Sequence, residues 1–137
     1  QAQEIAAETA SRPLTLDEIS DLQRNKTGAL IEWSACAGAL LAGEDPTNLR
    51  QYARALGLAF QIADDILDVE GDVETVGKAV GKDSDAGKAT FVSLLGLDTA
   101  KTRAKDMVEQ ACDALSPYGD RAQVLMDAAQ FVVTRKK

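Results

Sequence analysis

Histidine is absent from this chain of 137 residues. Its absence excludes His-based catalytic triads, HExxH zinc sites and acid–base catalysis by imidazole within the chain. Cysteine is nearly absent as well, because only Cys36 and Cys112 occur, each among small and apolar residues. Two isolated cysteines make neither a zinc site nor a disulfide framework, so we interpret both as buried free thiols.

Long apolar runs, basic clusters and strand patterns are also missing. No apolar run reaches the length of a membrane span and no signal peptide is recognisable, so we expect a cytoplasmic protein. The 15 basic residues are dispersed among 22 acidic ones, which argues against nucleic acid as a partner. Alanine and leucine dominate, and apolar residues do not alternate with polar ones as they do in strands. The composition therefore predicts an all-α fold.

Helix signals divide the chain into predicted segments. The small residues of 27–42 allow close approach between helices, so we expect that helix to lie deep in a bundle. The glycine-rich segment 77–90 is predicted to be a loop with one helical turn. The predicted helices are 1–11, closed by Arg12-Pro13; 15–21, opened by a Thr15–Glu18 capping box; 27–42, ended by Gly43; 47–70, capped by Thr47 and stopped by Gly71; 98–115; and a last helix capped by Asp120.

The beginning of the chain indicates that it is incomplete. Gln1 is not an initiator methionine, and the first ten residues start in the middle of a helical pattern. No internal repeat or linker suggests a second domain. We therefore expect residues 1–137 to be part of one all-α domain, a helical bundle from a longer protein.

Polar side chains interrupt the most apolar part of the predicted helix 47–70. Gln61, Asp64, Asp65 and Asp68 fall within an arc roughly 100° wide, and apolar residues occupy the other sides. Unpaired carboxylates cannot face an apolar core, so these residues must line a wet cavity or hold cations. Oxygen ligands of this kind suit Mg²⁺, which is commonly shared between carboxylates and a phosphate group. Chance or a solvated helix face also produces such a pattern.

Several lysines precede or follow the aspartates. Lys26 stands before the small-residue helix, and Lys78 and Lys88 lie in the glycine-rich segment. Lysine acts as a point charge for phosphate groups, and glycine lets the backbone approach them. Taken singly, each lysine could also be a solvated surface group, and we interpret Lys82 in that way.

Four motifs together resemble the trans-isoprenyl diphosphate synthases, the family of farnesyl and geranylgeranyl diphosphate synthases. FQIADDILD at 60–68 is similar to the second aspartate-rich motif of that family. KTG at 26–28 is similar to its Lys-Thr motif, and GK at 77–78, GKD at 81–83 and GKAT at 87–90 are similar to its lysine-bearing segment. The resemblance runs over essentially the whole chain, in order.

The resemblance implies the isoprenoid-synthase type of helical bundle and a function in isoprenoid biosynthesis. The implied enzyme is a Mg²⁺-dependent prenyltransferase that condenses an allylic diphosphate with isopentenyl diphosphate. It implies Mg²⁺ ligands at Asp64, Asp65 and Asp68. It further implies diphosphate contacts at Lys26, Thr27, Gln61, Lys78 and Lys88, with Asp64, Asp65, Lys26 and Lys78 as the catalytic residues.

The chain also departs from the family pattern. The family's first aspartate-rich motif and its basic residues for isopentenyl diphosphate have no counterpart here. We therefore interpret residues 1–137 as the C-terminal half of a synthase that is inactive alone, and whose complete form is a homodimer. Product length cannot be read from this half; the segment 81–101 resembles bacterial farnesyl synthases.

Two other functions fit the same fold. A terpene cyclase would need a metal motif that ends in glutamate. Asp72-x-x-Thr75 begins such a motif, but Ala79 stands where the glutamate should be. A non-catalytic subunit of a heteromeric synthase would be expected to lose its aspartates or Lys26, and all are present.

Overall fold

The computed structural model of the protein describes residues 14–76 and 90–135, without the side chains of residues 72–76. Every element in these ranges is helical, which confirms the all-α prediction. Lys78, Lys82, Lys88 and the predicted helix 1–11 lie outside the described residues. The elements are α2 (Leu16–Gln23), the π-helix η1 (Arg24–Gly28), α3 (Ala29–Ala42), α4 (Thr47–Val76), α5 (Phe91–Leu95), α6 (Leu97–Ala114), the 3₁₀ helix η2 (Ser116–Ala122) and α7 (Gln123–Thr134).

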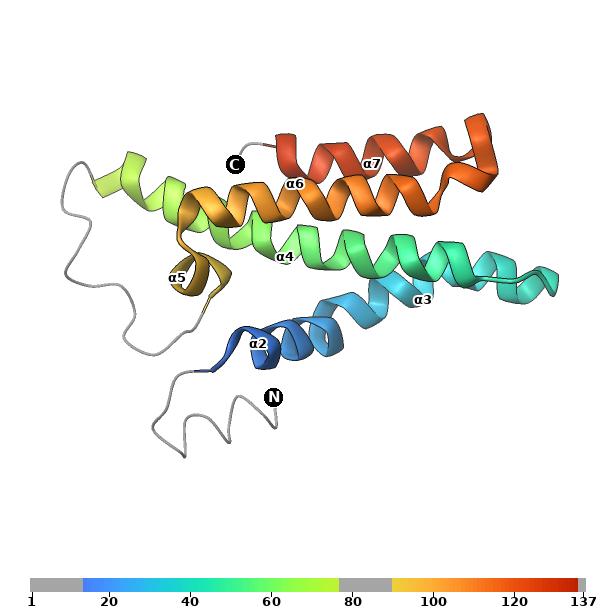
Figure 1. Cartoon of the computed structure of the whole chain (residues 1–137), viewed down its shortest axis with the longest axis horizontal. Coiled ribbons are helices and arrows are strands. Elements are labelled where there is room, and N and C mark those ends of the chain that lie inside the picture. The colour runs from blue at the N-terminus through green and yellow to red at the C-terminus, as the bar shows by residue number, and fades with distance from the viewer. Residues whose placement is uncertain (1–13, 77–89, 136–137) are drawn as a thin grey trace.

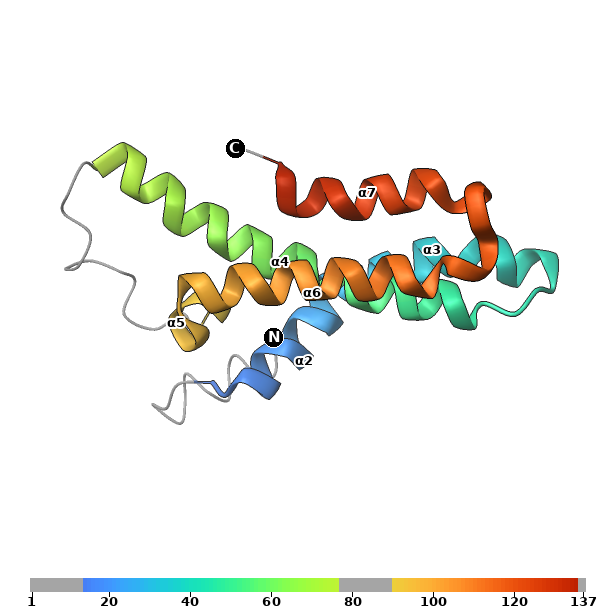
Figure 2. The same cartoon turned by 45° about the horizontal axis from the view of Figure 1, so that its top comes forward.

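The long helix α4 forms the middle of the bundle. Figure 1 shows α6 and α7 on one side of it and the run α2–η1–α3 on the other. The 45° turn in Figure 2 keeps α6 against α4, with α7 on the outer side of α6. With 30 residues, α4 is roughly 45 Å long and reaches across the bundle. The packing of the other helices on the two sides of α4 is therefore the main feature of the fold.

Small and medium side chains seal α4 against α6 and α7. Ala59 of α4 and Ala111 of α6 have no exposed surface, and neither has Leu115 after α6. Tyr52 is 2% exposed and donates its hydroxyl to the Leu125 carbonyl of α7 at 2.9 Å. Alanines at the contact let the two long helices approach closely, and the tyrosine finds the partner that a buried hydroxyl requires. This side is a closed core.

Several predicted helix boundaries are confirmed and others are wrong. Thr15 and Glu18 form the predicted capping box, and Gly43 ends α3 with φ +72°. Gly71 does not stop α4, which continues to Val76, since an interior glycine weakens a helix by only about 1 kcal/mol. The predicted helices 15–21 and 27–42 are not separated by an irregular segment, because η1 keeps the backbone helical from α2 into α3.

The predicted caps of α4 and α7 are also wrong. The Asp45 carboxylate accepts hydrogen bonds from the Thr47 backbone N–H at 3.0 Å and from its hydroxyl at 2.7 Å, so Asp45 caps α4. Asp120 lies within η2, and α7 begins only at Gln123, without a side-chain cap. Thr90 and Ser93 form an unpredicted capping box that starts the short helix α5.

Helix α3 lies at the edge of the described bundle and not deep within it. Only Cys36 is buried, where it faces the start of α4 with its thiol 4.0 Å from the Pro46 carbonyl. The apolar side chains of its other face are exposed: Leu30, Trp33, Leu40 and Leu41. A helix that is apolar all round is normally buried all round, and no described element covers this face of α3.

The cysteines and the membrane prediction are also addressed by the structure. Cys36 is buried, Cys112 is half-buried, and both thiols are free. Among the described residues, no helix combines the length and the apolar character needed to cross a membrane.

Candidate functional site

Two glycines fix the position of the predicted Lys-Thr motif beside α4. A Cβ atom added at Gly57 would lie 3.3 Å from the Cα atom of Gly28, so η1 and α4 touch backbone to backbone. Lys26 and Thr27 immediately precede this contact, Lys26 exposed and Thr27 half-buried. Gly57 is about one helical turn before Gln61 and roughly 10–16 Å along the axis before the aspartates. The structure thus brings the Lys-Thr motif to the helix that carries Gln61, Asp64, Asp65 and Asp68.

Gln61 is the one buried polar or charged residue in the described ranges, at 8% exposed. None of the hydrogen bonds formed by the described residues involves its amide group. Its amide atoms keep access to solvent, because in the described ranges the buried side-chain nitrogen or oxygen without a partner is Nε of Arg135. Its place on α4, one turn before Asp64 and Asp65, makes the amide available to a ligand at the aspartates.

Asp65 is half-buried and holds the start of α5. Its Oδ2 atom accepts the backbone N–H of Phe91 at 2.8 Å, while Phe91 itself packs among Ile19, Ile62 and Ile66. Burial raises the pKa of Asp65, the Phe91 N–H opposes that rise, and the charges of Asp64 and Asp68 add to it. The charged carboxylate is therefore disfavoured by its surroundings, and a bound cation would relieve that cost.

Asp64 faces the end of the last helix. Its Oδ1 atom lies 3.2 Å from Nη2 of Arg135, the residue that follows α7. The Arg135 guanidinium also lies over the Phe60 ring, 4.4 Å from the ring centroid. The Nε atom of Arg135 is buried and has no hydrogen-bond partner among the described residues. Asp64 is the more open member of the pair, with 57% of its side chain exposed against 22% for Arg135.

The aspartates do not form a closed metal cage by themselves. Asp68 is exposed, one turn beyond Asp64. Within residues 14–76 and 90–135, no group of three or more Asp, Glu, Cys or His side chains converges closely enough to hold a metal ion. Mg²⁺ fits such an open set, because it keeps several waters and is commonly bound through one or two carboxylates together with phosphate oxygens.

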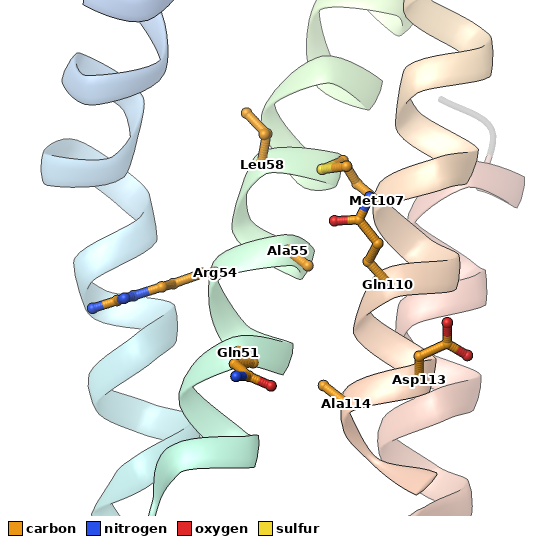
Figure 3. A pocket seen from close by; sticks show the side chains of 8 residues that line it. All are labelled: Gln51, Arg54, Ala55, Leu58, Met107, Gln110, Asp113 and Ala114. Carbon is orange, nitrogen blue, oxygen red and sulfur yellow. The ribbon is translucent and has the colours of Figure 1, made fainter.

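The described cavities lie beside the candidate site and do not contain the aspartates. The larger, about 610 Å³, opens between α4 and α6; Figure 3 shows Leu58, Met107 and Gln110 along it, while Arg54 extends toward α3. The smaller, about 190 Å³, adjoins the Gly28–Gly57 contact. In the described part of the chain, neither of these two cavities is lined by Asp64, Asp65 or Asp68.

Comparison with known proteins identifies the family. The sequence model of one family, described as Polyprenyl synthetase, matches residues 1–125. The chain belongs to the polyprenyl synthetase family. Among polyprenyl synthetases of known structure, an FPP/GFPP synthase from Zymomonas mobilis superimposes with a TM-score of 0.80 at 42% identity, covering 96% of this chain and 43% of the other.

Two curated relatives place the chain within longer proteins. A dimethylallyltranstransferase of Fischerella ambigua is 41% identical over 125 residues, which are 89% of this chain and 36% of that protein. The farnesyl diphosphate synthase of Escherichia coli is 39% identical over 144 aligned residues, which cover 100% of this chain and 48% of that protein. The chain thus spans about half or less of the polyprenyl synthetases that it matches.

Sequence reasoning missed two residues of the site. Arg135 was interpretable only as a basic residue suited to a helix C-terminus, since 71 positions separate it from Asp64. Phe91 gives no chemical signal, because it takes part through its backbone N–H. A signal existed only for α5, where Thr90-x-x-Ser93 is a capping pattern.

Proposed function

We propose that this chain is the C-terminal part of a single-domain prenyltransferase that elongates an allylic diphosphate with isopentenyl diphosphate. The relatives named farnesyl diphosphate synthase and dimethylallyltranstransferase support this reaction class. The observation that carries the proposal is the position of Gln61 one turn before two carboxylates on α4, on the helix that the Lys-Thr segment contacts. A diphosphate with Mg²⁺ would satisfy the amide and the carboxylates together.

In this proposal Asp64, Asp65 and Asp68 hold Mg²⁺, which would neutralise the negative charge that develops on the leaving diphosphate. Lys26, Thr27 and Gln61 donate hydrogen bonds to diphosphate oxygens. Lys78 and Lys88 are proposed for the same task, although both lie outside the described residues. Fixed donors and cations at these positions favour the transition state, because they match charge that appears only as the allylic C–O bond breaks.

The contact of α4 with α6 supports this site from another side of the helix. Ala59 of α4 and Ala111 of α6 are fully buried there, so the helix that carries the aspartates is held by a closed core. Asp65 has a second role, because its carboxylate accepts a hydrogen bond from the Phe91 backbone N–H. This hydrogen bond holds the start of α5, which follows the glycine-rich segment, against α4. A shift of Asp65 toward a metal would therefore also move the start of α5.

The remaining expectations for the whole protein stay proposals. They are a homodimer in its complete form, a cytoplasmic location and a first aspartate-rich motif in the other half. The silent-subunit alternative gains no support from the relatives, because those of Fischerella ambigua and Escherichia coli are named as enzymes. The lean toward a farnesyl product rests on resemblance alone.

A chimeric enzyme tests this function. The chain would replace the matching 48% of the E. coli farnesyl diphosphate synthase, and elongated allylic product would be measured with Mg²⁺, dimethylallyl diphosphate and isopentenyl diphosphate. We expect product from the chimera, and none from the 137-residue chain alone or from a chimera with Asp64→Asn and Asp65→Asn. A chimera that is helical and melts cooperatively but forms no product would contradict the proposal.

A further inference from the structure

The contact between Arg135 and Asp64 joins the end of the chain to the first aspartate of the candidate metal site. Asp64 belongs to α4 and Arg135 follows α7, so only the tertiary fold brings them together. Nη2 of the arginine approaches Oδ1 of the aspartate at 3.2 Å. The oxygen that would have to meet a metal ion thus already has a cation beside it.

The arginine is held there by more than charge. Its guanidinium lies over the Phe60 ring at 4.4 Å, and Phe60 is one turn before Asp64 on the same helix. Stacking on Phe60 therefore brings the guanidinium to the level of the Asp64 carboxylate. Residues 60 and 64 of α4 form one platform for the arginine.

The same contact is poorly optimised for stability. The buried Nε atom of Arg135 has no hydrogen-bond partner in the described ranges. Asp64 remains 57% exposed, and a pair with so much solvent access is weak. A weak pair with an unused donor can separate readily when a stronger ligand for the carboxylate arrives.

We propose that Arg135 is a positioning residue that occupies Asp64 in the metal-free protein and competes with the divalent cation for its carboxylate. This inference rests on the proposed function, because it takes Asp64 as a metal ligand. Competition is reciprocal: the metal displaces Arg135 by the same factor by which Arg135 weakens the metal. Metal binding would then release the C-terminal turn of α7 from α4.

Binding of Mn²⁺ to the full 137-residue chain, followed by electron paramagnetic resonance, tests the competition. Arg135→Met removes the charge and keeps the length of the side chain. We expect it to tighten Mn²⁺ binding about three- to tenfold, the size that a weak ion pair and a cation–π contact together allow. Arg135→Lys keeps the charge but loses the stack, so its affinity should lie between the two.

Arg121→Met is the matched control, because it makes the same change in net charge from an exposed position in η2. It should leave the affinity within about twofold, since a distant exposed charge is screened. As a second readout, hydrogen exchange of the amides of residues 131–135 should quicken when Mn²⁺ is added to the unmodified chain, and should not respond to Mn²⁺ in Arg135→Met.

The outcomes separate the two proposals. Equal or weaker binding by Arg135→Met, with the unmodified chain binding Mn²⁺, would overturn the competition and leave the metal site standing. Absence of binding in both would overturn the metal site and the competition with it. Tighter binding in the Arg121→Met control as well would assign the effect to net charge and overturn the role of Arg135.

Discussion

The two sides of α4 differ in how completely their polar and apolar groups are satisfied. Toward α6 and α7, Ala59, Ala111 and Leu115 are fully buried, and the Tyr52 hydroxyl has a partner. On the rest of its surface α4 carries Gln61, whose amide forms no hydrogen bond within the described ranges, and a half-buried carboxylate at Asp65. The first side resembles any stable helical core, whereas on the second side burial disfavours the charged form of Asp65. The difference locates stability on one side and the proposed chemistry on the other.

The apolar side chains of α3 are also incompletely buried. Helix α3, which follows the contact of η1 with α4 at Gly28 and Gly57, leaves Trp33 68% and Leu41 90% exposed. The relatives' chains are about twice as long as this one. No described element covers this face of α3.

The largest expected effect belongs to the closed side. Leu115→Ala removes a side chain with no exposed surface, so it should lower the free energy of unfolding by about 2–5 kcal/mol. Urea denaturation followed by circular dichroism measures the change. Leu41→Ala makes the same substitution at a position that is 90% exposed and should cost less than about 0.5 kcal/mol. Similar losses for the two variants would contradict the contrast between a closed and an open side.

A smaller effect is expected where α3 is tied to α4. Glu32 of α3 accepts hydrogen bonds from Nε of Arg50 at 3.0 Å and Nε of Arg54 at 2.8 Å. Glu32→Gln should lower the free energy of unfolding at pH 7 by about 0.5–1 kcal/mol, because these pairs are largely solvent-accessible. Glu109→Gln, on the exposed face of α6, is the matched control and should have no measurable effect.

The stability difference between the unmodified chain and Glu32→Gln should depend on pH. The hydrogen bond from Arg54 lowers the pKa of Glu32, with burial acting in the opposite direction and the charges of Arg54 and Arg50 adding to the lowering. A lowered pKa stabilises the folded protein above the ordinary glutamate value, and this contribution is lost as the pH falls through the lowered value. The difference between the unmodified chain and Glu32→Gln should therefore shrink in acid. A difference that grows in acid would show that the ion pairs do not hold α3.

The sequence predicted the fold class and most of the candidate site because helices depend largely on local pattern. Apolar periodicity and the capping box at Thr15 gave α2, α4 and α6, and the placement of Gln61 with Asp64, Asp65 and Asp68 on α4 follows from helical spacing. Local signals failed where alternatives were close in energy. Gly71 is compatible with both a stop and a continued helix, and Asp45 competed with Thr47 for the cap.

Long-range contacts were beyond sequence reasoning for a physical reason. The approach of Arg135 to Asp64 depends on how α7 packs back over α6 and α4, which no spacing in a single sequence encodes. The bond from the Phe91 N–H to Asp65 likewise depends on where α5 returns to α4. These two contacts place Asp64 and Asp65 in different surroundings, although the sequence alone does not distinguish the two aspartates.

Calorimetry with Mg²⁺ and a non-hydrolysable allylic diphosphate analogue tests the central claim most directly. The 137-residue chain should give a binding heat that requires both Mg²⁺ and the analogue. Asp64→Asn, Asp65→Asn and Asp68→Asn combined should abolish it, while the chain stays as helical and as stable as before. Asp98→Asn, Asp106→Asn and Asp113→Asn combined, on the exposed surface of α6, should leave the heat unchanged. Loss of the heat in the α6 variant as well, or its persistence without the three aspartates of α4, would contradict the account.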